Sequence, residues 1–383
     1  MNVFNAGRSV LAALAVAVGS IAGVPTAQST SDLLSSAVAD WEPLPGPGGE
    51  ANALFAPRSG ALFATTSAGL FRSDDGGQAW AAVPVPWSGE SSWFVVDPVD
   101  HRRIYGQGDD GLYRTDDDAA TWSRILSIDR SAAEGGEKLN AFAPSAADQD
   151  LLYVEMGGPP YQKMHWLLRS RDGGATWEEL ERRGGYQSMA AWADSLLEAH
   201  PTDATRLFRA SGSTTGGVFD FDLQQSVDQG TTWSAVLEKS TIYPGYLVGG
   251  RGPSPAHFYL AGNLNYRIGG SAVFTSTDNG VSWRRVLDER GGGAFEKRDS
   301  STLVGGLAYD PGAPDRVYVG VNRFVGDRGP RTGSAVMTSG DGGTTWVDLG
   351  QTDIGKINNL VLGVDGQNLY AATDQGVWRF RLP

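Results

Sequence analysis

Hydrophobic and polar positions alternate in short runs along most of the chain from residue 40 onward. Runs such as 94–96, 103–106 and 316–320 are rich in Val, Ile, Tyr and Phe and are bounded by Gly, Pro or Asp. This pattern is typical of β-strands joined by tight turns. No segment keeps the apolar spacing of a helix over several turns. The pattern therefore predicts an all-β fold.

One turn pattern, Ser/Thr-x-Asp-x-Gly-x-Thr-Trp, occurs six times between such runs. An Asp at this position can accept hydrogen bonds from backbone N–H groups that follow it, and Gly supplies the positive φ of a reversing chain. The Trp opens the next strand with a large apolar face. We expect a structural role for the Asp and Trp of each copy, which are Asp75 and Trp80, Asp117 and Trp122, Asp172 and Trp177, Asp228 and Trp233, Asp278 and Trp283, and Asp341 and Trp346. The second copy has Ala119 in place of Gly, so we expect a distorted turn there.

The two ends of the chain lack complementary parts of the repeat. Trp41–Pro45 resembles the strand that follows each repeat turn, although no turn precedes it. Residues 369–380 parallel residues 62–72, but no repeat turn or final strand follows them. We predict a seven-bladed β-propeller of four-stranded antiparallel blades, closed by residues 41–45 pairing with the C-terminal strands. Such closure removes exposed sheet edges.

The six turns resemble the Asp-box, or bacterial neuraminidase repeat, of sialidases, sortilin-type receptors, xyloglucan-cleaving glycosidases and photosystem II assembly factors. The resemblance covers residues 40–383 and is greatest to the single seven-bladed photosystem II assembly factor-like propellers. It implies a propeller that serves as a binding scaffold. Sialidases have six blades and a Phe/Tyr-Arg-Ile-Pro motif near the start, whereas the nearest string here, Tyr266–Gly269, is in mid-chain and lacks the Pro.

The N-terminus predicts export. Arg8 is the only charged residue before Asp32, and Val10–Val18 is apolar and is followed by small residues up to Ala27. The apolar run is shorter than the roughly 20 residues of a membrane span. We expect a signal peptide at 1–27, a linker at 28–39 and the propeller at 40–383. The mature chain would be periplasmic or extracellular, with no membrane span.

Composition narrows the class of partner. The net charge of −13 argues against nucleic acid as a partner. The chain has no Cys, so its stability must come from packing without disulfides. The four His residues are scattered without zinc-type spacing, and we expect no metal and no cofactor. We expect a monomer that binds a protein or a carbohydrate.

Insertions in blades 3–6 collect on one face of the predicted propeller, which is often the binding face of a repeat protein. Their aromatic, amide and guanidinium groups suit sugars or carboxylates. The candidate ligand-binding residues are Glu155, Tyr161, His165, Tyr186, Tyr266, Arg267, Asn322, Arg323 and Arg328.

Two hypotheses remain open for this face. The first is a non-catalytic scaffold that binds a protein or glycan. The second is a glycoside hydrolase of sialidase or xyloglucanase type. Glycoside hydrolysis normally needs two carboxylates in a set geometry. Glu155, Asp194, Asp299, Asp327 and Asp353 can each reach the face, but nothing in the sequence pairs any two of them. The catalytic residues are therefore unknown.

Overall fold

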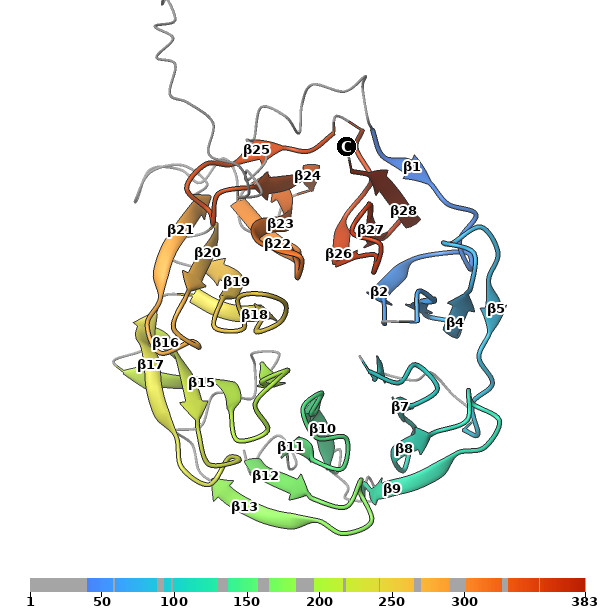
Figure 1. Cartoon of the computed structure of the whole chain (residues 1–383), viewed down its shortest axis with the longest axis vertical. Helices are drawn as coiled ribbons and strands as arrows, with labels where there is room; N and C mark the ends of the chain where they lie inside the picture. The colour runs from blue at the N-terminus through green and yellow to red at the C-terminus, as the bar shows by residue number, and fades with distance from the viewer. Residues whose placement is uncertain are drawn as a thin grey trace, which may run out of the picture.

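A computed structural model describes residues 40–382, except 58, 88–92, 98, 130–136, 158–164, 184–195, 216–217, 241, 265–269, 290–300, 326–329 and 351. Within these residues the chain forms seven antiparallel four-stranded sheets around a central axis, and no helix occurs (Figure 1). The predicted seven-bladed propeller is thereby confirmed. The predicted signal peptide and linker lie outside the described residues.

Each blade begins with its strand nearest the axis and ends with its outermost strand. Blade 1 comprises β2 (Ala51–Phe55), β3 (Leu62–Thr66), β4 (Gly69–Ser73) and β5 (Ala81–Ala82). Blade 2 comprises β6 (Phe94–Val96), β7 (Ile104–Gln107), β8 (Gly111–Thr115) and β9 (Ser123–Ser127). Blade 3 comprises β10 (Lys138–Pro144), β11 (Leu152–Gly157), β12 (His165–Ser170) and β13 (Glu178–Arg183). Blade 4 comprises β14 (Leu197–Ala199), β15 (Leu207–Thr215), β16 (Val218–Ser226) and β17 (Ser234–Ser240). Blade 5 comprises β18 (Ile242–Gly249), β19 (Phe258–Leu264), β20 (Ser271–Ser276) and β21 (Arg284–Glu289). Blade 6 comprises β22 (Ser301–Asp310), β23 (Ala313–Phe324), β24 (Arg331–Ser339) and β25 (Val347–Asp348). Blade 7 comprises β26 (Ile357–Leu362), β27 (Asn368–Thr373), β28 (Gly376–Arg381) and β1 (Glu42–Pro43).

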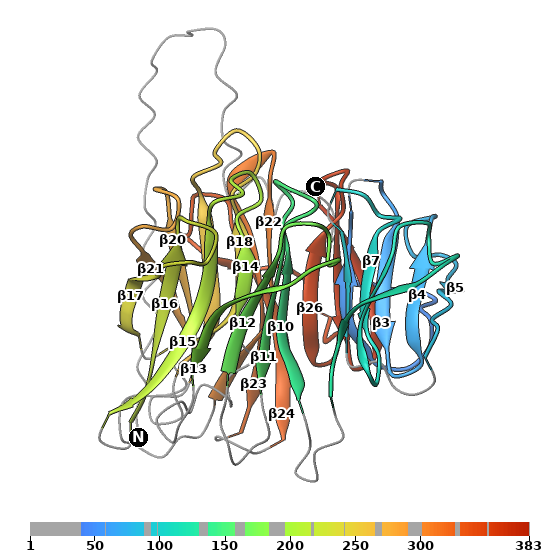
Figure 2. The ribbon, with the colours of Figure 1, turned by 90° about the horizontal axis from the view of Figure 1, so that it is seen from below.

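The strands run between two faces of the ring (Figure 2). One face, called here the turn face, carries the first-to-second turns and the repeat turns. The other, called the loop face, carries the second-to-third hairpin ends and the connections between blades. On the loop face the hairpins of blades 1, 2 and 7 are tight. The insertion expected in blade 6 is partly strand, because β23 continues to Phe324 and β24 starts at Arg331.

One aromatic position packs neighbouring blades together. It lies on the second strand of each blade and is occupied by Phe63, Tyr105, Tyr153, Phe208, Tyr259, Tyr318 and Tyr370, all of which are buried. Tyr318 of blade 6, for example, clusters with Ile357 and Leu360 of blade 7. Burial of a large apolar side chain contributes roughly 1.5–3 kcal/mol. Seven such contacts form the core between the blades rather than along the axis.

The six repeat turns share one hydrogen-bond network. In blade 3, Ser170 Oγ donates to Asp172 Oδ1 (2.8 Å) and accepts from Gly174 N (2.7 Å). Asp172 also accepts from Thr176 N (2.8 Å) and Thr176 Oγ1 (2.6 Å). These donors stabilise the carboxylate and lower the pKa of Asp172 to about 2. The structural role expected for these Asp residues fits this geometry.

The tryptophans of the repeats connect adjacent blades. Trp177 Nε1 of blade 3 donates to the Ile125 carbonyl of blade 2 (2.7 Å). Gly174 has a φ of +96°, and a Cβ at this position would lie 2.8 Å from Cβ of Ile125. Glycine is therefore needed both for the backbone conformation and for the approach of the neighbouring blade.

The expected distortion of the second repeat turn does not occur. Ala119 takes the left-handed conformation itself, with a φ of +67°. Its N–H still donates to Thr115 Oγ1 (3.0 Å), and Thr121 N still donates to Asp117 Oδ1 (2.8 Å). The network holds the turn in place even though an L-residue pays about 1–2 kcal/mol for this conformation.

The ring closes in blade 7, as predicted. Glu42 and Pro43 of β1 pair with Arg379 and Trp378 of β28. The indole of Trp41 is buried, and its Nε1 donates to the Leu349 carbonyl of blade 6 (3.0 Å). The N-terminal strand thus takes the outermost place in the C-terminal blade.

Candidate functional site

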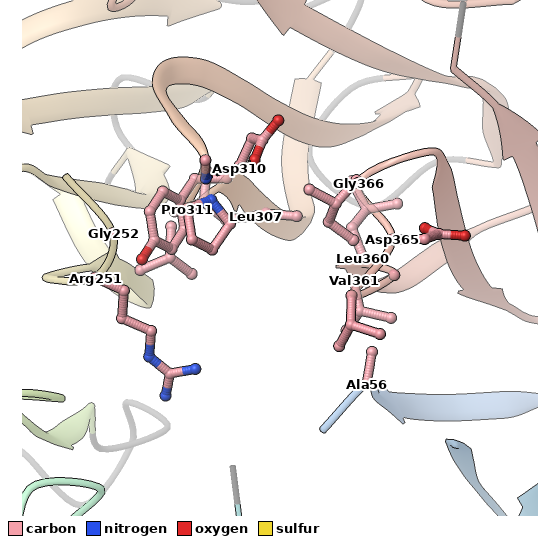
Figure 3. Close-up of a pocket in the computed structure, with 17 residues that line it drawn as sticks. Ala56, Arg251, Gly252, Leu307, Asp310, Pro311, Leu360, Val361, Asp365 and Gly366 are labelled. Carbon is pink, nitrogen blue, oxygen red and sulfur yellow. Dashed lines mark hydrogen bonds between the residues drawn. The ribbon is translucent and has the colours of Figure 1, made fainter. Parts of the chain in front are cut away.

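A recess of about 900 Å³ opens on the turn face at the centre of the ring. It lies among the inner strands and first-to-second turns of blades 5, 6, 7 and 1. Its walls are largely apolar and include Ala56, Val248, Leu307, Leu360 and Val361. Figure 3 shows two groups of side chains that face each other across the gap, one from blades 5 and 6 and the other from blades 7 and 1.

Arg251 extends into this gap (Figure 3). It lies in the turn between β18 and β19, where Gly249, Gly250 and Gly252 all have positive φ. A Cβ at Gly252 would lie 1.7 Å from the Pro311 carbonyl oxygen. The glycines therefore let the turn pack directly against blade 6, which directs the side chain of Arg251 into the gap (Figure 3).

A smaller cavity of about 220 Å³ adjoins the recess and shares Val248, Arg251 and Tyr309 with it. Glu198, on the inner strand β14, lines this cavity. Glu198 is exposed to the channel rather than packed in the core. The surrounding blades raise the pKa of its carboxyl, and the positive charge of Arg251 opposes the rise. Burial also raises the pKa of Tyr309 to about 12, so its hydroxyl stays protonated near neutral pH.

The other two charged residues that line the recess, Asp310 and Asp365, accept hydrogen bonds within the turns that border it. Asp310 Oδ1 accepts from Gly312 N (2.8 Å), and Asp310 Oδ2 lies 3.6 Å from Arg316 Nη1. Asp365 accepts from Gln367 N (2.9 Å) and from Asn368 Nδ2 (2.7 Å). In Figure 3 both carboxylates point away from the guanidinium of Arg251. These acids therefore stabilise the turns that border the recess.

Five of the ligand-binding residues predicted from the sequence lie outside the described residues. They are Tyr161, Tyr186, Tyr266, Arg267 and Arg328. The other four lie on strands at the loop-face ends of blades 3 and 6: Glu155 on β11, His165 on β12, and Asn322 and Arg323 on β23. The structure brings Glu155 and His165 together, and separately places Asn322 beside Arg323 on one strand.

The blade 3 residues form a small polar cluster. His165 Nδ1 lies 3.6 Å from Glu155 Oε1 and 3.5 Å from Asn140 Nδ2. The imidazole is buried and the side chain of Glu155 is only 17% exposed. A carboxylate beside an imidazole can hold it in a fixed orientation or exchange a proton with it.

In blade 6, Asn322 braces the next blade. Its Nδ2 donates to the Ile357 carbonyl (2.8 Å), and its Oδ1 accepts from Ile357 N (2.8 Å) and Ser334 Oγ (2.9 Å). The side chain is buried. Nearby, Arg331 donates two hydrogen bonds to Asp353 (2.7 and 3.2 Å), and these lower the pKa of the Asp353 carboxyl. Asp353 is therefore held as a carboxylate at the loop face.

Glu198, Arg251 and Tyr309 were not identified from the sequence as site residues. Two signals were present. Arg251 is flanked by glycines in a first-to-second turn, and Glu198 interrupts the apolar inner strand between Leu197 and Ala199. An acid on an inner strand and a cation in a glycine turn both suggest side chains directed at the central channel.

Two features are absent from the described residues. No group of three or more His, Asp or Glu side chains there is arranged to hold a metal ion. No helix in that part of the chain is long and apolar enough to cross a membrane.

Sequence comparison finds similarity to xyloglucanases. The chain is 26% identical over 250 residues to a xyloglucanase of a Paenibacillus species, a match that covers 57% of this chain and 23% of that protein. It is 26% identical over 287 residues to xyloglucanase Xgh74A of Acetivibrio thermocellus, covering 70% of this chain and 27% of that enzyme. The chain thus spans about a quarter of the length of these curated relatives. No family model matches it.

Comparison of structures finds the same fold in other proteins of known structure. The GH74 xyloglucanase from Xanthomonas campestris superimposes with a TM-score of 0.61 at 19% identity, over 90% of this chain and 54% of that one. YCF48 from Cyanidioschyzon merolae superimposes with a TM-score of 0.52 at 15% identity, over 90% of this chain and 99% of that one. These likenesses support the propeller fold.

Proposed function

We propose that this chain is an exported, monomeric Asp-box propeller that binds a glycan on the loop face of blades 3–6 without cleaving it. A protein ligand is the alternative occupant of that face. The sequence similarity to xyloglucanases makes a β-glucan such as xyloglucan the first ligand to test. Glu155, His165 and Arg323 would contribute from the strands. Tyr161, Tyr186, Tyr266, Arg267 and Arg328 would contribute from the connecting segments.

The non-catalytic part of this proposal rests on the described carboxylates of the loop face, on the pKa of one and the position of the other. A glycosidase needs a general acid with a raised pKa and a second carboxylate across the scissile bond. Asp353 has the opposite shift, because Arg331 stabilises its charged form. Glu155 lies against His165, within a blade rather than across the channel. Among the described residues of this face, these two acids therefore do not form the pair that hydrolysis requires.

A glycoside hydrolase is the second candidate function. The similarity to xyloglucanases favours it, and so does Glu198, because a carboxyl with a pKa of about 7 is suited to act as a general acid. The charged residues lining the recess beside Glu198 supply no second free-standing acid, since Asp310 and Asp365 are held in turns.

The test measures binding and cleavage on the same protein. Affinity electrophoresis of the chain from residue 28 onward in gels with xyloglucan, mixed-linkage glucan or pectin gives binding. Release of reducing ends from the same polymers gives cleavage. We expect retardation by at least one glucan without new reducing ends. We expect Arg323→Ala to weaken binding about tenfold through loss of a charge-assisted hydrogen bond, whereas the turn-face control Arg102→Ala has no effect.

Other outcomes would decide against this proposal. Cleavage that is lost in Glu198→Gln or Glu155→Gln would establish the hydrolase. Absence of retardation by every glycan, with capture of a protein that Arg323→Ala abolishes, would assign the face to a protein ligand. Equal retardation of the wild type and Arg323→Ala would remove the loop face of blade 6 from the site.

A further inference from the structure

The recess on the turn face lies at the opposite end of the central channel from the loop face, and the proposed glycan binding does not use it. Its volume of about 900 Å³ is within the range of small-molecule sites, about 300–1,000 Å³. Such sites are mostly apolar with a few convergent polar groups. Two facing apolar walls and one inward guanidinium match that description (Figure 3).

The positive charge of Arg251 in the gap favours an anionic ligand. The chain as a whole is acidic, with a net charge of −13. The charged residues that line the recess are Arg251, Asp310 and Asp365. The two acids are held by their own turns and point away from Arg251 (Figure 3). The positive charge therefore faces the gap, and its planar donors match a carboxylate.

We propose that this recess binds a small organic carboxylate with an apolar body. Arg251 pairs with the carboxylate. The body packs between Val248 and Leu307 on one side and Leu360 and Val361 on the other. Tyr309 lines both the recess and the smaller cavity, and its ring adds to the apolar surface between them.

Glu198 makes the site sensitive to pH. The titratable groups that line the smaller cavity are Glu198, Arg251 and Tyr309. Ionised Glu198 attracts Arg251 and competes with a bound carboxylate, whereas neutral Glu198 does not. Because the raised pKa of Glu198 brings its protonation into the range in which the ligand stays ionised, binding should tighten as Glu198 takes up its proton.

The test uses phenylbutyrate as the carboxylate and phenylbutanol as its neutral counterpart, with binding followed by ligand-observed NMR on the whole chain. We expect saturable binding of the acid and much weaker binding of the alcohol. Arg251→Gln should weaken phenylbutyrate binding about 10- to 100-fold, the usual loss for a charge-assisted hydrogen bond. Arg102→Gln is the matched control, because Arg102 lies in the corresponding turn of blade 2 and is exposed.

Two further variants guard against indirect effects. Ala56→Phe fills the recess from the blade 1 side and should abolish binding while Arg251 remains. Glu198→Gln should remove the difference in affinity between about pH 6 and about pH 8 that we expect of the wild type. The melting temperature of each variant shows whether it is folded.

The proposal is overturned if the acid and the alcohol bind equally, or if Arg251→Gln binds as well as the wild type. It is equally overturned if neither probe shows saturable binding to the wild-type chain. None of these results bears on the glycan proposal, which concerns the other face and other residues.

Discussion

Trp41→Ala tests the closure of the ring at a single side chain. The indole is 6% exposed, packs 5.5 Å from the ring of Phe380, and donates from Nε1 to the Leu349 carbonyl. Truncation of a buried Trp to Ala usually costs about 3–5 kcal/mol. The change also leaves the Leu349 carbonyl without its indole donor. We therefore expect a loss at the upper part of that range.

This loss of free energy of unfolding can be expressed as a decrease in melting temperature. With an unfolding entropy of about 2.1 cal/mol/K per residue, the free energy of unfolding of a ring of about 340 residues changes by about 0.7 kcal/mol per kelvin near its midpoint. A loss of about 3–5 kcal/mol should then lower the melting temperature by roughly 4–7 °C. Differential scanning calorimetry measures this directly. Trp41→Phe, which keeps an aromatic ring but loses the N–H donor, should fall between the wild type and Trp41→Ala.

Trp122→Ala provides the matched control. Trp122 occupies the same repeat position, and its Nε1 donates to the Pro84 carbonyl (2.9 Å). Its indole is half-buried, and the chain joins its strand β9 directly to the two blades it connects, whereas β1 is far in sequence from blades 6 and 7. We expect a smaller decrease. If Trp41→Ala lowers the melting temperature no more than Trp122→Ala does, Trp41 has no special role in closure.

Deletion of residues 40–46 extends the test to the whole closing strand. It removes β1 and leaves β28 as an open edge in blade 7. Open edges pair with other chains, so we expect self-association as well as a larger loss of stability than in Trp41→Ala. Light scattering during a thermal scan reports the association. A deleted chain that stays monomeric and melts like the wild type would refute closure by this strand.

Three further predictions concern other positions. Gly174→Ala should lower the free energy of unfolding by about 2–4 kcal/mol in urea titration, because it combines left-handed strain with a clash against Ile125; a loss below about 0.5 kcal/mol would contradict it. Asn322→Ala should lower it by about 2–4 kcal/mol, because both backbone groups of Ile357 lose a partner; an unchanged midpoint would show that Asn322 is not a brace. The depressed pKa values of the repeat Asp residues, about 2 for Asp172, give stability that is present above about pH 4 and lost as pH falls toward 2. Thermal scans across that range should show Asp172→Asn losing less stability than the wild type on acidification; parallel curves would contradict this.

The sequence was sufficient for the blades and their closure because one local network repeats. Each copy places a Ser or Thr, an Asp and a Trp at fixed spacing, so the six copies mark six blades and Trp41 marks the seventh. Trp41 lacks a blade before it and residues 369–380 lack a strand after them, and only a ring satisfies both. Ala119 was misjudged, because the hydrogen bonds to Thr115 and Asp117 hold the backbone more strongly than the residue type opposes it.

The candidate site was harder to derive. Strand lengths in blade 6 depend on Asn322, whose residue type disfavours a strand but whose side chain bonds to the neighbouring blade. The recess depends on where Arg251 points, and three glycines with positive φ determine that direction. Residue spacing carries no information about either effect, since both arise from contacts between blades.

The closing strand also constrains the order of folding during synthesis. Glu42 pairs with Arg379, 337 residues later in the chain. At about 5–20 residues per second, a ribosome needs roughly 20–70 s to make that partner after β1 has been synthesised. During this interval β1 has no sheet to join, while the repeats of blades 1 to 6 can form one after another. A strand of two residues that includes a proline offers few backbone groups to a wrong partner during that wait. Its shortness therefore suits it to be the first strand made and the last one placed.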